Sequence, residues 1–320
     1  MLAYLQSFRP RAWPSLQEEL GDGDKALKTA FEAVDNMEFD RASDAFEEAI
    51  RLGCQYMPLA LNYSGTFAFI RGDVDVAIAE FNKSLDLDPN QAQVWAKRAS
   101  VHMEKCKHPL SHSLRFCLGF SHVFFFVFFF LLRLFGVLGT DVGQADRSAA
   151  MADFAKAIEV DPADPDVYYH RGQVRFLMGD FSDAAADYTK SAELDKKFVY
   201  SQVQLGVAQY KMGQINDSLL TFRKCLKQFK NSAEAYNYYG EILLDQGNFA
   251  EASEKFDTAI DLERTAGQGK KVRNIMPLVN RAVLYLQWKK DAKEAERNLR
   301  SALERNPAFP ILSPLEVLLG

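Results

Sequence analysis

The stretch DPDVYYHRGQVRFLMGDFSDAAADYTKSAELDKK, residues 164–197, decides the fold. Two stretches of matching pattern follow it, at residues 199–232 and 233–266. A glycine stands at the same place in each unit, with intervals of 34 residues: Gly172, Gly206 and Gly240. A second glycine series and an aromatic series keep this interval: Gly179, Gly213 and Gly247, and Tyr188, Phe222 and Phe256. A fixed period of this size indicates a repeat protein.

Each recurring residue has a physical role in a helix–turn–helix unit. The small residue at the eighth place lets the first helix lie close against the second. The glycine near place fifteen ends the first helix, because a left-handed conformation costs glycine little. We expect the aromatic residue of the second helix to fill the gap between neighbouring units. The unit resembles the tetratricopeptide repeat (TPR), so the sequence predicts an all-α fold, a TPR superhelix of stacked antiparallel helix pairs.

The same register extends along most of the chain and gives seven units, one of them split. The predicted organisation is a linker at 1–22, the N-terminal part of the array at 23–105, a hydrophobic insertion at 106–144, the C-terminal part of the array at 145–309 and an apolar tail at 310–320.

The insertion at 106–144 contains the run VFFFVFFFLL and leaves three interpretations open. Residues 116–132 have the minimum length for a membrane span, but a span here would separate repeats that need each other's apolar faces. A metal site is the second interpretation, although the spacing matches no zinc pattern: Cys106, His108, His112 and Cys117. The third, which we favour, is translated non-coding sequence such as a retained intron, because pyrimidine-rich codons encode Phe, Leu, Ser and Val.

Composition excludes several classes of function. The net charge of −5 argues against nucleic acid as a partner, because phosphate binding draws on a basic excess. The four cysteines form no CxxC pair, which argues against a disulfide-stapled scaffold or a zinc ribbon. The sequence contains no glycine-rich phosphate loop, HExxH or GxSxG motif, so we expect no cofactor, no metal and no enzymatic activity.

First helices of TPR units line a surface that binds peptides or partner helices. Places 2, 5, 9 and 12 of successive units predict an aromatic and aliphatic wall followed by an acidic patch. We expect it to suit an apolar segment with basic flanks. Some of the aromatic residues could instead pack between units, Phe176 and Tyr210 more readily than Tyr169 and Tyr200. The predicted precursor-binding residues are Tyr169, Gln173, Phe176, Tyr200, Val203, Val207, Tyr210, Glu234, Asn237 and Glu241.

A carboxylate clamp for chaperone C-termini is not predicted. It needs Lys and Asn in one unit, Asn in the next, and Lys and Arg in the third. No three consecutive units present that set. Lys97 and Asn62 match in isolation, and we expect both on solvated helix faces.

Several longer motifs carry a more specific resemblance: YLQSFRPR at 4–11, ALNYSGTFAFIRGD at 60–73, VWAKRASVHME at 94–104, YNYYGEILLDQGNF at 236–249 and PLVNRAVLYLQW at 277–288. These resemble the C-terminal TPR domain of the fungal-type seventy-kilodalton import receptor of the mitochondrial outer-membrane translocase. The resemblance covers most of residues 3–308 apart from the insertion.

The resemblance implies a receptor on the cytosolic face of the mitochondrial outer membrane. Its implied partners are hydrophobic precursor proteins, typically metabolite carriers with internal targeting signals, and other translocase subunits. It also implies delivery by Hsp70 and Hsp90, although the clamp and the N-terminal anchor of the family are not matched here. The alternatives are a generic soluble TPR scaffold or co-chaperone-type protein without a clamp, and a membrane protein anchored through 116–132.

Overall fold

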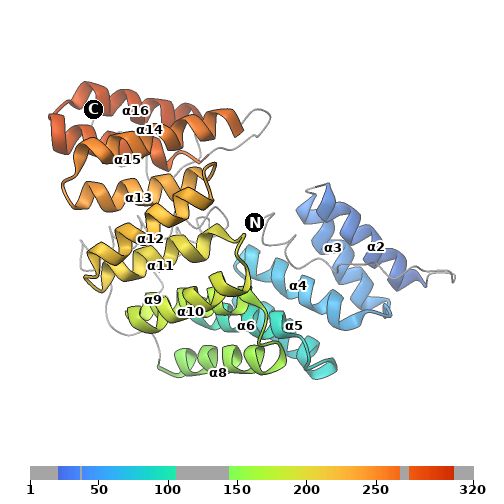
Figure 1. Ribbon diagram of the computed structural model, residues 1–320. Helices are drawn as coiled ribbons and strands as arrows, with labels where there is room; N and C mark the ends of the chain where they lie inside the picture. The colour runs from blue at the N-terminus through green and yellow to red at the C-terminus, as the bar shows by residue number, and fades with distance from the viewer. Residues whose placement is uncertain (1–20, 37, 106–143, 267–273, 306–320) are drawn as a thin grey trace. The chain divides into compact units, whose positions relative to one another are not determined.

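The computed structural model describes residues 21–36, 38–105, 144–266 and 274–305, and every regular element in these ranges is a helix (Figure 1). The chain divides into unit 1, Met1–Val174, and unit 2, Arg175–Gly320, with the boundary inside α9 (Pro165–Met178). Unit 1 also contains α2 (Asp22–Asp35), α3 (Phe39–Arg51), α4 (Met57–Arg71), α5 (Val74–Leu87), α6 (Ala92–Lys105) and α8 (Gln144–Val160). Unit 2 contains α10 (Phe181–Leu194), α11 (Val199–Lys211), α12 (Ile215–Gln228), α13 (Ala233–Asp245), α14 (Phe249–Ala266), α15 (Met276–Leu284), the π-helical turn η3 (Tyr285–Lys289) and α16 (Ala292–Arg305). The all-α TPR prediction is confirmed.

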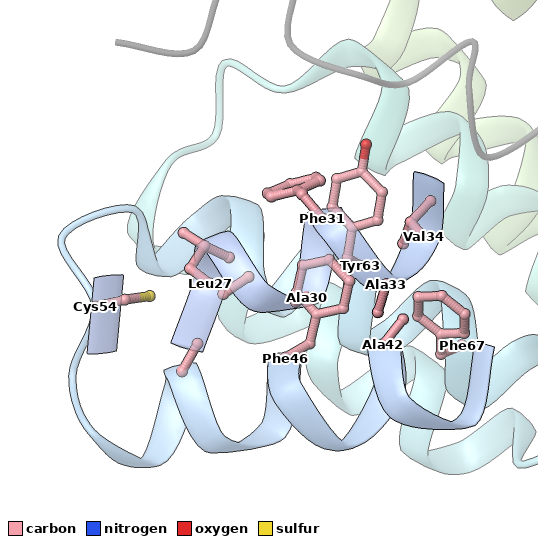
Figure 2. Close-up of a cluster of buried hydrophobic side chains, with 12 residues drawn as sticks. Leu27, Ala30, Phe31, Ala33, Val34, Ala42, Phe46, Cys54, Tyr63 and Phe67 are labelled. Carbon is pink, nitrogen blue, oxygen red and sulfur yellow. The ribbon is translucent and has the colours of Figure 1, made fainter. Parts of the chain in front are cut away.

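Within each unit, consecutive helices pack as antiparallel hairpins, and neighbouring hairpins of the same unit pack against each other. In unit 1 the first hairpin, α2–α3, closes against α4 through a cluster of buried rings (Figure 2). The Phe46 ring stacks on that of Tyr63 at 5.0 Å between centroids, and Phe31 meets both rings edge-on at 5.2 Å and 4.9 Å. Because Tyr63 belongs to the following hairpin, the first hairpin cannot bury its rings alone.

The split repeat forms a hairpin like the others. Helix α6 ends at Lys105 and α8 begins at Gln144, and the two pack against each other. The Arg98 guanidinium donates to both carboxylate oxygens of Asp153, at 2.8 Å and 2.7 Å, which ties the two helices by a bidentate ion pair. Residues 106–143 lie outside the described residues, so the three interpretations of the insertion stay predictions.

The eighth-place glycines lie directly beneath an aromatic ring of the same hairpin. A Cβ atom on Gly206 would lie 2.7 Å from the Phe222 ring, and one on Gly240 would lie 2.6 Å from the Phe256 ring. The aromatic residue was expected to fill the gap between units, and it also covers a glycine within its own hairpin. Phe222 covers the glycine of its own hairpin and also stacks on Tyr239 of the next, at 5.5 Å between centroids.

The last hairpin ends its first helix differently from the others. Glycine occupies the left-handed position after four earlier first helices, with φ between 72° and 88°: Gly72, Gly179, Gly213 and Gly247. In the last hairpin Lys290 stands there with a φ of 53°, after the π-helical turn η3. A π-helical turn accommodates one extra residue. The last unit, residues 275–309, is one residue longer than the 34-residue period, and its extra residue therefore lies in the end of the first helix.

The predicted linker, up to residue 20, and the predicted tail at 310–320 lie outside the described residues. Helix α2 begins at Asp22, within one residue of the predicted start of the array. In the ranges that the structure describes, no helix combines the length and the apolar character that a bilayer crossing requires.

Candidate functional site

Three first helices of unit 2, α11, α13 and α15, pack in succession and carry most of the predicted binding residues. We call the side chains that they present together the inner face of unit 2. It comprises Tyr200, Tyr210, Glu234, Glu241, Asp245 and Val283, together with Leu286 of the adjoining η3; the buried Asn237 and Asn280 support it through hydrogen bonds to Glu241. Tyr169 and Gln173 belong to unit 1 and are described with it.

Burial separates the predicted residues into two groups. Val203, Val207 and Asn237 are fully buried, so they hold α11 and α13 in place and offer no surface. The other predicted residues of unit 2 are half-buried, with part of each side chain at the surface: Phe176, Tyr200, Tyr210, Glu234 and Glu241. On α15 and η3, Val283 is 37% exposed and Leu286 is 43% exposed, so two large apolar side chains stand open to solvent.

Two tyrosines of α11 reach across to carboxylates of α13. The Tyr200 hydroxyl donates to Glu234 Oε1 at 3.4 Å, and the Tyr210 hydroxyl donates to Asp245. Burial raises the pKa of Tyr200 well above its usual range, and the Glu234 carboxylate raises it further. Burial likewise raises the pKa of Tyr210. Both phenols therefore stay protonated as hydrogen-bond donors.

A polar cluster at Glu241 links α13 to α15. Glu241 Oε1 accepts hydrogen bonds from Asn237 Nδ2 at 2.7 Å and Asn280 Nδ2 at 2.6 Å, and Asn280 Nδ2 also lies 3.0 Å from Asn237 Oδ1. Burial raises the pKa of Glu241 to about 7, against the lowering effect of the two amides. The group therefore exchanges a proton near neutral pH.

The carboxylates of α13 are held by neutral donors alone within the described part of the chain. Glu234, Glu241 and Asp245 form no ion pair with any lysine or arginine there. A carboxylate held by neutral donors keeps its negative charge available to a second partner. The inner face of unit 2 can therefore receive a cationic group between apolar side chains.

Unit 1 carries a polar centre of opposite charge, which the sequence did not predict. The Lys97 ammonium donates to Asn62 Oδ1 at 2.7 Å and to Thr66 Oγ1 at 3.0 Å, and lies 5.5 Å from the centre of the Tyr63 ring. Lys97 is only 3% exposed, so the expectation that Lys97 and Asn62 sit on solvated faces is wrong. Burial lowers the pKa of Lys97 to about 7.

Beside Lys97 lies a cavity of about 10 Å³, lined by Gln93, Ala96, Lys97, Ser100, Asp164, Asp166, Val167 and His170. This volume suits about one water molecule and no larger ligand. Burial lowers the pKa of His170, opposed by the nearby Asp166. The aspartates that line the cavity make it unsuited to a client carboxylate, so the contact between Lys97 and Asn62 does not amount to a chaperone clamp.

Tyr169 and Gln173 take part in a hydrogen-bonded chain within α9. Gln173 Nε2 donates to the Tyr169 hydroxyl at 3.2 Å, and His170 Nδ1 lies 3.0 Å from Gln173 Oε1. Tyr169 is 1% exposed, although it was expected to reach the surface more readily than Phe176 or Tyr210. In unit 1, therefore, these two predicted residues are engaged with neighbours of their own chain.

Three polar residues outside the predicted binding positions share one place in the repeat. Lys97, His170 and Asn280 all stand at the sixth place of their units, one residue after a place that was counted. A polar residue recurring at that place would have indicated a second inward-facing position. Cys54 and Cys225 are buried, and burial raises the pKa of each thiol.

Among the described residues no group of three or more His, Cys, Asp or Glu side chains is arranged to hold a metal ion. The metal interpretation of Cys106, His108, His112 and Cys117 concerns residues outside the described ranges.

Comparisons with known proteins fit this architecture. The tetratricopeptide repeat family profile matches residues 27–92, 141–197 and 203–268, more than half of the chain. The human mitochondrial import receptor subunit TOM70 is 26% identical over 96% of this chain and 47% of its own length. The Saccharomyces cerevisiae TOM70 is 37% identical over 41% of this chain and 21% of its own length.

The chain therefore spans about half the length of its human relative. Among solved structures, a tetratricopeptide repeat protein from Parabacteroides merdae superposes with a TM-score of 0.63, covering 93% of this chain and 98% of its own, at 14% identity. That likeness concerns the fold alone. The resemblance to the seventy-kilodalton receptor is confirmed, and the chain belongs to the tetratricopeptide repeat family.

Proposed function

We propose that the chain is a protein-binding receptor array that takes up hydrophobic precursor segments for mitochondrial import, at the cytosolic face of the outer membrane. Its similarity to TOM70 over nearly the whole chain supports the import role, and its repeat family is a non-catalytic, protein-binding one. Carrier-type precursors with internal targeting signals are the proposed cargo, and other translocase subunits are the proposed neighbours.

The observation that carries the proposal is the inner face of unit 2. Half-buried Tyr200 and Tyr210 and exposed Val283 and Leu286 supply apolar contacts on either side of the α13 carboxylates. Tyrosine rings bind apolar partners at a low cost in conformational entropy. The carboxylates have no ion-pair partner among the described residues and so favour basic residues at the flanks of an apolar client segment.

A binding titration with the whole chain tests this proposal. The probe is a fluorescent peptide with an apolar centre and lysines at both ends, and the variant is Tyr200→Ala combined with Tyr210→Ala. Loss of two aromatic contacts predicts at least about tenfold weaker binding. The matched control is Tyr236→Ala, a half-buried tyrosine of α13 outside the predicted binding positions.

Two results would contradict the proposal. One is unchanged binding in the double variant. The other is an equal loss in the Tyr236→Ala control, which would point to general damage to α11–α13 packing.

A further inference from the structure

An aromatic and basic patch lies where α15 and η3 end and α16 begins, in the last hairpin of unit 2. We define it as Phe249, Tyr285, Trp288, Lys289, Lys290 and Lys293. The Trp288 ring stacks on Phe249 of α14 at 6.1 Å between centroids and remains 39% exposed. The Lys289 ammonium lies 4.8 Å from the centre of the Trp288 ring and 5.2 Å from that of Tyr285.

The lysines of this patch are free to meet an external anion. Lys289, Lys290 and Lys293 are all exposed, and none of them forms an ion pair with a carboxylate of the described residues. Asp291 is the one acid between them, and its Oδ1 accepts the backbone N–H of Glu294 at the start of α16, at 3.0 Å. Residues 288–293 therefore carry three positive charges against one negative charge.

The combination of groups matches one kind of partner. Tryptophan places its amphipathic ring at the boundary between lipid headgroups and acyl chains. Lysines beside it attract anionic headgroups, and the lipids can move laterally to meet side chains that diverge from a turn. The three lysines and Trp288 stand at or next to this turn, which contains the π-helical η3 and the left-handed Lys290.

We propose that the aromatic and basic patch docks peripherally on an anionic membrane surface, with Trp288 at the headgroup boundary and the three lysines on lipid phosphates and carboxylates. This contact requires no client and uses none of the inner-face residues, so it goes beyond the proposed receptor function. Binding is expected to be weak and salt-dependent, because three lysines and one ring supply only a few favourable contacts.

Flotation of the whole chain with vesicles tests the patch. The vesicles are phosphatidylcholine with or without phosphatidylserine, and the variant is K289E/K290E/K293E. Its matched control, K224E/K227E/K230E, changes net charge equally at three exposed lysines of unit 2 outside the patch. The stretch at 106–144 is present in every sample, so only differences between variants are interpreted. The patch variant should lose at least about tenfold in partitioning to anionic vesicles, and the control should lose far less.

A second readout places the ring itself. Brominated acyl chains in anionic vesicles should quench part of the tryptophan emission of the wild type, and this part should vanish in Trp288→Phe but persist in Trp95→Phe. Equal losses of vesicle binding in the two triple variants would overturn the proposal, and so would quenching that does not depend on Trp288. Binding of an acidic peptide by the patch without any binding to anionic vesicles would also overturn it.

Discussion

Each unit holds an ionisable side chain among neutral polar partners, and the two side chains have opposite charges. In unit 1 a buried ammonium, Lys97, is held by the oxygens of Asn62 and Thr66. In unit 2 a half-buried carboxylate, Glu241, is held by the amides of Asn237 and Asn280. Burial moves both pKa values to about 7, one downward and one upward.

The difference lies in what remains for a partner. Around Lys97 the polar groups satisfy one another and enclose a cavity with room for about one water molecule. On the inner face of unit 2, by contrast, Tyr200 and Tyr210 are half-buried, and Val283 and Leu286 are exposed. The shared repeat scaffold thus carries polar residues engaged in internal contacts in unit 1, and exposed apolar side chains in unit 2, where we propose client binding.

The largest expected effect concerns Lys97. Its folded-state pKa is about 7 against 10.5 for an ordinary lysine, so the folded state binds fewer protons than the unfolded state between these values. The free energy of unfolding of the wild type, relative to that of Lys97→Met, should therefore rise by roughly 3 kcal/mol as the pH increases from 7 to 10. Urea unfolding followed by Trp95 fluorescence, in unit 1, measures it. A difference that is flat with pH would mean that Lys97 is solvated.

The second prediction tests what the units share. A Cβ atom on Gly65 would lie 2.9 Å from the Phe81 ring in unit 1, and one on Gly206 would lie 2.7 Å from the Phe222 ring in unit 2. Both rings are fully buried, so a shift of either ring would disturb the packing around it. Alanine at either glycine should therefore destabilise its own unit by about 2 kcal/mol in urea unfolding.

The paired variant Gly206→Ala with Phe222→Leu serves as the control for this clash. It should recover part of the loss, because the smaller side chain makes room for the new methyl group. If the losses in free energy of unfolding of Gly206→Ala and Phe222→Leu simply add in the paired variant, the glycine is not needed to make room for the Phe222 ring.

The third prediction reverses the sign of the first. Glu241 has a folded-state pKa of about 7 against 4.5 for an ordinary glutamate, so the folded state binds more protons between these values. Stability of the wild type relative to Glu241→Gln should fall by about 1–2 kcal/mol as the pH rises from 4.5 to 7.5. Trp288 fluorescence in unit 2 reports the unfolding. A rise over this range would contradict the raised pKa.

The smallest effect is expected at Glu234, which is held by the Tyr200 hydroxyl at the edge of the inner face. Glu234→Gln keeps the shape of the side chain and removes its charge. Binding of a lysine-flanked apolar peptide should weaken about two- to fivefold at low salt, and the difference should disappear at high salt. Asp75→Asn, an exposed acid of unit 1, is the control and should leave binding unchanged.

The architecture could be predicted from sequence because its signals repeat. The glycine and aromatic series give both the period and the close approach of the two helices in a hairpin, whereas the contact of Phe222 with Gly206 of its own hairpin was not predicted. The roles of inner-face residues are harder to predict, since they depend on neighbours far apart in the chain. Lys97 meets Asn62 across 35 positions, and Asn280 meets Glu241 across 39. No local pattern encodes such pairs, so Lys97 read as a solvated lysine and Asn280 went unnoticed.

Site-specific photo-crosslinking tests the client-binding face most directly. A photoreactive residue replaces Leu286, on the inner face of unit 2, or Leu87, a leucine of unit 1 that is even more exposed and lies outside the predicted binding positions. With a radiolabelled carrier precursor, we predict a strong adduct from position 286 that an excess of the lysine-flanked peptide abolishes, and little or none from position 87. Equal adducts from both positions, or none from position 286, would contradict the assignment of client binding to unit 2.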